Sequence, residues 1–299
     1  MTQDGLLVID KPAGMTSFDV VRKVRKVANT RKVGHTGTLD PDATGVLAVA
    51  IGRCTKLSRF VTLDEKRYAF TMTFGSATDT DDASGELIRQ AAWEHVTRAA
   101  FEQVLDTFTG AIEQVPPQYS AIKIKGKRAH ALARAGEEVE LQARTVQVWE
   151  WEITGFRLPQ VDLEVRCGPG TYVRSLSRDI GEALDSAAHA DKIRRLAVGP
   201  FSIDDAVALD ELTPETFADA LLSPLEMVQT LPRFRLDEQD IIRVGYGQPI
   251  HTSGPWADDE FIAGHNDDDQ LVAILGCRRR SAEAVELWPK RVMMPAGEG

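Results

Sequence analysis

The stretch Gly34-His35-Thr36-Gly37-Thr38-Leu39-Asp40-Pro41-Asp42-Ala43-Thr44-Gly45 is the starting point for interpreting this chain. Its mixture of glycine, threonine, aspartate, proline and histidine follows neither a helical nor an alternating period, which predicts a loop. The apolar run at residues 46–51, closed by Gly52, predicts a buried strand. A polar loop that leads directly into a core strand is rigidly held, and this suits a catalytic group.

Asp40 has three roles open to it on the residues alone. It caps a turn, binds a metal together with Asp42 and His35, or acts as a nucleophile or general base. Aspartate in glycine-rich turns commonly bonds nearby backbone amides, which favours the cap. A Cys/His cluster and EF-hand spacing are both missing from the surrounding sequence, which disfavours the metal. Pro41 restricts Asp40 towards an extended conformation.

Regular patterns flank this loop on both sides. Residues 5–10 predict a strand, and a turn at 11–17 precedes a helix over 18–28 that has one apolar and one basic side. Apolar side chains alternate along residues 66–74, which predicts a strand. On this pattern alone, Tyr68 is interpreted as a core aromatic. The same criteria predict helices at 97–108, up to 183 and from 213, and strands at 144–156 and 160–167.

Later stretches differ in the chemistry that they indicate. Residues 112–140 combine proline, aromatic and basic side chains, a mixture that suits an arm in contact with RNA. Arg174 falls in the first turn of a predicted helix, where a cation is mildly unfavourable beside the helix dipole. A buried anion nearby would account for it, and a surface arginine is the alternative. The acidic loop at 79–85 lacks the glycine and glutamate of an EF-hand, so we assign it no chemistry.

Composition limits the class of protein. The 299 residues suffice for one large domain and a smaller one, and the three scattered cysteines suggest reduced thiols in the cytoplasm. We expect neither a membrane span nor a secretory signal. The formal net charge is −10, but basic residues gather in the first sixty positions, and local patches rather than net charge determine phosphate binding. With no P-loop and no dinucleotide fingerprint, we expect no cofactor and no metal.

Six motifs resemble those of the TruB family of tRNA pseudouridine synthases. The long string from Gly34 to Leu47 is the most specific of them. The others are D-K-P-A-G-M-T-S from Asp10, K-R-Y from Lys66, V-P-P-Q-Y-S-A-I-K from Val115, G-T-Y-V-R-S-L from Gly170 and the strand around Leu196. Specific motifs cover about three quarters of the chain, and the match is looser in the tail.

The resemblance implies a role for individual residues. It makes Asp40 the catalytic nucleophile and places Arg174 beside it, where the cation would keep the carboxylate ionised and oriented. It places Tyr68 against the target base, with a hydroxyl in reach of proton transfer. The resemblance also implies RNA or substrate contacts at further residues: His35 where the uridine leaves the stack, Tyr172 in the G-T-Y motif, Leu196 at the base pocket, Tyr119 and Lys123 in the arm, and Lys11, which either contacts phosphate or structures its turn.

The implied fold is α+β, with a mixed or antiparallel sheet in a catalytic domain at 1–230 that carries the RNA-contacting insertion at about 112–140. A small PUA-like β-barrel follows at 231–299. The implied reaction converts uridine to pseudouridine at position 55 in the T-loop of tRNA, after base flipping, in a cytoplasmic monomer that needs no protein partner.

Two alternatives belong to other classes. A tRNA-binding folding factor with incidental catalysis would use the same basic arm and tail. A glycosidase-like hydrolase would pair Asp40 with Asp42, but neighbours two apart in a proline-containing loop are poorly placed to converge on one sugar.

Overall fold

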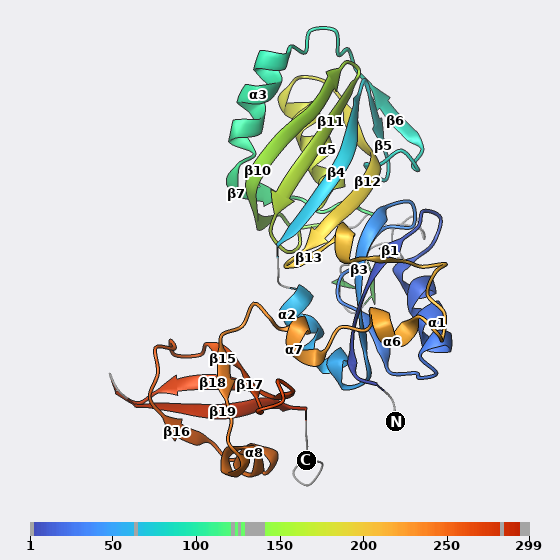
Figure 1. Ribbon diagram of the computed structural model, residues 1–299. Helices are drawn as coiled ribbons and strands as arrows, with labels where there is room; N and C mark the ends of the chain where they lie inside the picture. Colours follow the sequence, from blue (N-terminus) through green and yellow to red (C-terminus); the bar gives the residue numbers. More distant parts are fainter. Residues whose placement is uncertain are drawn as a thin grey trace.

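A computed structural model describes residues 3–62, 65–120, 123–124, 127–128, 141–281 and 284–293. A mixed ten-stranded sheet runs through the larger part of this described chain (Figure 1). Its order is β14 (Val207–Ala208), β1 (Gly5–Lys11), β3 (Thr44–Ile51), β12 (Ala188–Val198), β4 (Lys66–Phe74), β11 (Gln160–Cys167), β10 (Arg144–Arg157) and β7 (Gly110–Gln114), with β2 (Val33–His35) on β3 and β13 (Phe201–Ser202) on β12.

The two halves of this sheet meet where β3 runs parallel to β12. The contact is short and pairs Arg194 with Thr44 and Arg195 with Gly45. Gly45 has a φ of 98°, and a Cβ atom there would lie 2.2 Å from the carbonyl oxygen of Arg195. Only glycine fits this close backbone approach. The last glycine of the Gly34–Gly45 stretch therefore allows the loop before β3 to lie against β12.

Helix α1 (Ser17–Val27) covers the β1–β3 half of the sheet. It begins with a capping box, in which the hydroxyl of Thr16 accepts a hydrogen bond from the backbone of Asp19 and the carboxylate of Asp19 accepts one from the backbone of Thr16. Its buried side chains, Val20, Val21 and Val24, pack in one cluster with Leu7 of β1 and Leu47 of β3. The helix expected over 18–28 is confirmed.

Helices α3 (Arg98–Thr107) and α5 (Val173–Ala183) cover the other half (Figure 1). Their apolar side chains share a cluster with β4 and β11, including Phe101, Leu176, Phe70, Met72 and Leu163. The strand expected over 66–74 is confirmed with both bounds. Shorter elements are η1 (Gly52–Leu57), α2 (Ser58–Thr62), β5 (Ser76–Thr78), β6 (Leu87–Gln90), β8 (Lys123–Ile124), β9 (Lys127–Arg128), η2 (Ile203–Asp205), α6 (Phe217–Ala220) and α7 (Pro224–Met227).

One helix start differs from expectation. The sequence predicts a helix from Thr213, whereas α6 begins at Phe217. The Thr216 hydroxyl donates to the carbonyl of Glu211 and accepts from the backbone of Thr213, so threonine side chains hold a turn ahead of the helix.

The C-terminal part forms a second sheet of five strands (Figure 1). Its order is β15 (Arg233–Arg235), β17 (Phe261–His265), β18 (Leu271–Arg279), β19 (Val285–Val292) and β16 (Ile250–Thr252), with α8 (Glu238–Gly245) beside it. Ala263 and Ile274 of this sheet share a buried cluster with Leu6, Val8 and Ala48 of the larger one. The expected α+β class with a sheet-rich, PUA-like C-terminal part is confirmed. The expected boundary at 230/231 falls between α7 and β15 and stays a prediction.

None of the helices described here combines the length and the apolar character needed to cross a lipid bilayer.

Candidate active site

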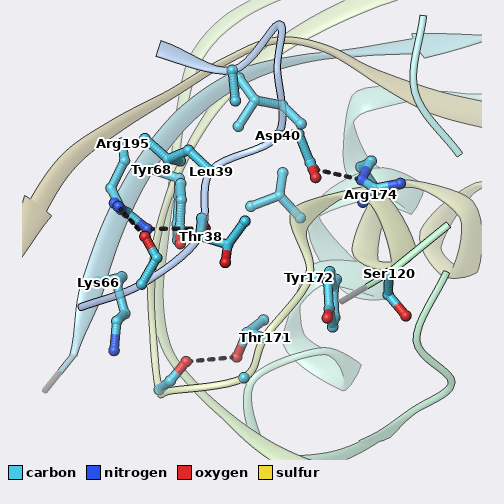
Figure 2. A pocket seen from close by; sticks show the side chains of 16 residues that line it. Thr38, Leu39, Asp40, Lys66, Tyr68, Ser120, Thr171, Tyr172, Arg174 and Arg195 are labelled. Carbon is cyan, nitrogen blue, oxygen red and sulfur yellow. Dashed lines mark hydrogen bonds and ion pairs between the residues drawn. The ribbon is translucent and has the colours of Figure 1, made fainter. Parts of the chain in front are cut away.

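A cavity of about 250 Å³ opens where the loop before β3 meets β4, β12 and the start of α5. Asp40 lies at its wall with Arg174, and the rings of Tyr68 and Tyr172 border it from different elements (Figure 2). Residues from distant parts of the chain thus meet around one carboxylate, that of Asp40. The structure brings these four predicted site residues together.

Arg174 is the most constrained of them. Its side chain is only 3% exposed, and its Nε atom lies 2.9 Å from Oδ2 of Asp40. Nη1 donates to the carbonyl of Thr80 at 2.8 Å, and Nη2 donates to the carbonyl of Tyr119 at 3.0 Å. The expected pairing of Arg174 with Asp40 is present. Because the planar guanidinium is held by backbone carbonyls on two segments, it fixes the direction in which Asp40 points.

A second carboxylate, Asp82, shares the same guanidinium. Its Oδ2 atom lies 3.5 Å from Nε of Arg174. Its Oδ1 atom accepts hydrogen bonds from the hydroxyl of Thr80 at 2.7 Å and from the backbone and hydroxyl of Ser84. We assigned no chemistry to this acidic loop, and that interpretation missed Asp82. The buried anion expected near Arg174 is therefore two carboxylates, which local spacing could not reveal because they come from separate loops.

The pKa of Asp40 departs from expectation. Burial raises the pKa of this carboxyl above its ordinary value, the Arg174 guanidinium opposes the rise, and the Asp82 carboxylate adds to it. The expectation that Arg174 would lower the pKa describes only one of these contributions.

Lys11 lies beneath the loop rather than on the surface. The side chain is fully buried, and Nζ donates to the carbonyls of Pro12, Met15 and Pro41 at 2.9, 2.7 and 2.9 Å. Burial lowers the pKa of Lys11 to about 8, while the carboxylates of Asp42 and Asp40 oppose the change. All three donors are engaged, so the geometry supports the structuring of the turn and not the phosphate contact.

Arg195, which the sequence interpretation did not select, holds the loop from β12. It is 2% exposed, and its Nε and Nη2 atoms donate to the carbonyls of Val46 and Gly37 at 2.7 and 3.2 Å. Burial raises the pKa of Tyr68, and the nearby Arg195 guanidinium partly opposes the rise. Tyr68 is therefore a neutral phenol at neutral pH.

The role of Leu196 at the base pocket stays a prediction. Ile193 and Arg195 line the cavity, and Leu196 does not. Successive side chains of a strand point to opposite faces, so residues 193 and 195 share the cavity side. Irregularities in the pairing of β12 with β4, on both sides of residues 194 and 195, make this register hard to read from sequence.

The other predicted contacts are placed as follows. Tyr172 precedes α5, and its backbone exchanges two hydrogen bonds with the buried side chain of Gln114. His35 ends β2 opposite Val49 and is not among the residues that line the cavity. The carbonyl of Tyr119 accepts a hydrogen bond from Arg174, and the predicted RNA contact of its side chain stays a prediction. Lys123 lies in β8, and its side chain and residues 129–140 of the insertion lie outside the described residues.

Comparisons with known proteins agree with this site. Residues 25–173 match the model described as TruB family pseudouridylate synthase (N terminal domain), and residues 174–229 match tRNA pseudouridylate synthase B C-terminal domain. The tRNA pseudouridine synthase B of Thermobifida fusca is 46% identical over 84% of this chain and 88% of its own length. That of Mycobacteroides abscessus is 41% identical over 97% of this chain and 98% of its own length.

Solved structures share the fold. A chain of a Cbf5-Nop10-Gar1 complex superposes with a TM-score of 0.77 at 27% identity, covering 97% of this chain and 85% of that one. A chain of an H/ACA RNP bound to a substrate RNA containing 2'-deoxyuridine gives the same TM-score at 24% identity, covering 98% and 86%. With its motifs, its fold and relatives more than 40% identical over most of its length, this chain belongs to the TruB family of pseudouridylate synthases.

Proposed function

We propose that this TruB family member converts uridine to pseudouridine at position 55 in the T-loop of tRNA, with Asp40 as the nucleophile. The observation that carries the proposal is the carboxylate of Asp40, which faces the cavity, is held by Arg174 at 2.9 Å and is bordered by Tyr68 and Tyr172. Its relatives from Thermobifida fusca and Mycobacteroides abscessus are named tRNA pseudouridine synthase B.

The chemistry requires few components. The reaction breaks the bond between uracil N1 and ribose C1′, turns the base and joins C1′ to C5. The C5 hydrogen leaves as a proton and N1 regains one, so the reaction is neither an oxidation nor a reduction. A nucleophilic carboxylate must be ionised, and Arg174 and Lys11 act in that direction at Asp40. Detached uracil must stay in place, which the surrounding walls of the cavity favour.

The base must leave the loop before it reaches Asp40. Extrusion costs a few kcal/mol of stacking, and less in a loop than in a duplex. Stacking on an aromatic ring returns about 1–3 kcal/mol per base, a role that we assign to Tyr68. We assign to His35 the contact with the RNA where the uridine departs, and to Lys123 a phosphate contact. The protein acts on tRNA as a cytoplasmic monomer without a protein partner.

The alternatives fit this geometry less well. A hydrolase with paired acids would need Asp42 to face the cavity that Arg174, Tyr68 and Tyr172 share with Asp40, whereas Asp42 lines an adjacent cavity that also borders Asp40. The folding of tRNA alone does not require a buried arginine, Arg174, that holds the carboxylates of Asp40 and Asp82. Retained folding of tRNA by an Asp40→Asn variant would identify such activity as an added role.

The test uses tRNA labelled with tritium at C5 of uridine. The wild-type protein should release tritium to water, and Asp40→Asn should not, whereas Asp42→Asn provides the matched control in the same loop. A tRNA with cytidine at position 55 should give no release when every other uridine is labelled. Normal release by Asp40→Asn would exclude it as the nucleophile, and release from the cytidine-55 tRNA would exclude the proposed position.

A further inference from the structure

Helix α5 carries a second arginine, Arg178, one turn after Arg174. Both arginines reach the same two segments: the acidic loop, residues 79–85, and the insertion root, residues 115–120. Arg174 donates to the carbonyls of Thr80 and Tyr119. Arg178 donates from Nη1 to the carboxylate of Asp81 at 2.7 Å and from Nη2 to the carbonyl of Val115 at 2.8 Å. Residues four apart share one face of a helix, which explains the parallel reach.

The ion pair of Arg178 with Asp81 is partly sheltered from solvent, whereas its hydrogen bond to the carbonyl of Val115 is exposed. Its side chain is 21% exposed and that of Asp81 is 12% exposed. Burial raises the pKa of Asp81 to about 6, with Arg178 and Arg174 opposing, so the carboxylate is ionised at neutral pH. Asp81 also has a φ of 60°, an uncommon conformation for aspartate. Asp81 thus pairs with Arg178 while its own backbone adopts a conformation that aspartate does not favour.

The insertion root is held at both of its ends. The carbonyl of Val115 accepts from Arg178 and also from the hydroxyl of Ser175 at 2.9 Å. The carbonyl of Tyr119 accepts from Arg174, the residue that orients Asp40. Arg178 itself is not among the residues that line the Asp40 cavity. Arg178 therefore contacts the acidic loop and the base of the insertion without lining the cavity itself.

We propose that Arg178 and Asp81 form a positioning pair, which seats the root of the RNA-contacting insertion on the catalytic loops so that bound tRNA is presented to Asp40. This inference rests on the proposed function. Loss of the pair leaves Asp40, Arg174 and Tyr68 in place but lets the start of the insertion shift. The variant binds tRNA more weakly and, once saturated, reacts at close to the normal rate.

The experiment measures tRNA binding and tritium release for Arg178→Ala, Asp81→Asn and the double variant. We expect both the Kd and the KM for tRNA to rise about tenfold in each, with kcat within about twofold of wild type and the double variant no worse than the single ones. Arg178→Lys keeps the pairing with Asp81 and should recover part of the loss. If Arg178→Ala folds poorly, Arg178→Lys and Asp81→Asn still test the effect of the pair on tRNA binding.

Two controls separate positioning from simple charge. Removal of the Asp81 carboxylate alone makes the surface less acidic, which by charge would tighten RNA binding, whereas the proposal expects it to weaken. If Arg178 contacted a phosphate, Arg178→Ala would reduce the slope of log Kd against log salt by about one, and the proposal expects an unchanged slope. Arg98→Ala, an exposed arginine paired with Glu102 on α3, controls for loss of one positive charge.

The outcomes are distinct. A fall in kcat with unchanged KM, a reduced salt slope or tighter binding by Asp81→Asn would overturn the positioning pair. Absence of tritium release from the wild-type protein would instead contradict the proposed function. The Kd of wild type and variants for a T-stem-loop RNA would still test whether Arg178 and Asp81 support RNA binding.

Discussion

Replacement of Arg174 by lysine isolates what the guanidinium geometry contributes, because the charge is kept. Lysine can stay near Asp40 but cannot reach both the carbonyl of Thr80 and that of Tyr119, which accept from Arg174 at 2.8 and 3.0 Å. Hydrogen bonds from charged groups contribute about 1.5–3 kcal/mol each. With one donor partly regained by the ammonium, we expect a loss of about 2–4 kcal/mol in the free energy of unfolding.

The loss in activity follows from orientation. A displacement of about 1 Å at a reacting group can reduce a rate by about 100-fold, and we expect kcat to fall by about that factor for Arg174→Lys. Arg174→Met also removes the cation that opposes the raised pKa of Asp40, so that pKa should rise further. Because Asp40 acts when ionised, the acid limb of activity should move to higher pH in the methionine variant.

Single-turnover tritium release at saturating tRNA measures the rate, and urea unfolding measures the stability. Tyr246→Phe, at an exposed position in the C-terminal part, is the control variant, and its kcat and stability should match those of wild type. If Arg174→Lys keeps kcat within threefold of wild type, the carbonyl contacts do not orient Asp40. An unchanged acid limb in Arg174→Met would show that the guanidinium does not affect the ionisation of Asp40.

Two further predictions concern the neighbours of Asp40. Lys11→Met should lower the free energy of unfolding by about 2–4 kcal/mol, because three backbone carbonyls lose their donor. It should leave the slope of log Kd for tRNA against log salt unchanged. A slope reduced by about one would identify a phosphate contact instead. Asp82→Asn should move the acid limb of kcat/KM to lower pH, because the Asp82 carboxylate contributes to the raised pKa of Asp40; a limb that moves to higher pH would show that loss of order around Arg174 dominates.

Local patterns predicted most of the regular elements. The alternation over 66–74 identified β4, and the apolar spacing over 18–28 identified α1, because each pattern depends on neighbours within one element. The helix expected from Thr213 begins at Phe217, after a turn in which the side chains of Thr213 and Thr216 each accept a hydrogen bond from the backbone of the other. Short elements without a strong period were the least predictable.

The sequence by itself determined the family and the identity of the principal groups, since the stretch around Asp40 and the motif around Arg174 are long and specific. The motifs also implied that Arg174 meets Asp40, but only the tertiary structure showed which other groups surround this pair. Arg174 binds carbonyls that lie 94 and 55 residues away in the chain, and irregular strand pairing puts Ile193 rather than Leu196 at the cavity. Sequence patterns report the backbone preference and burial of one element, whereas such contacts depend on strand order and register among elements that are distant in the chain.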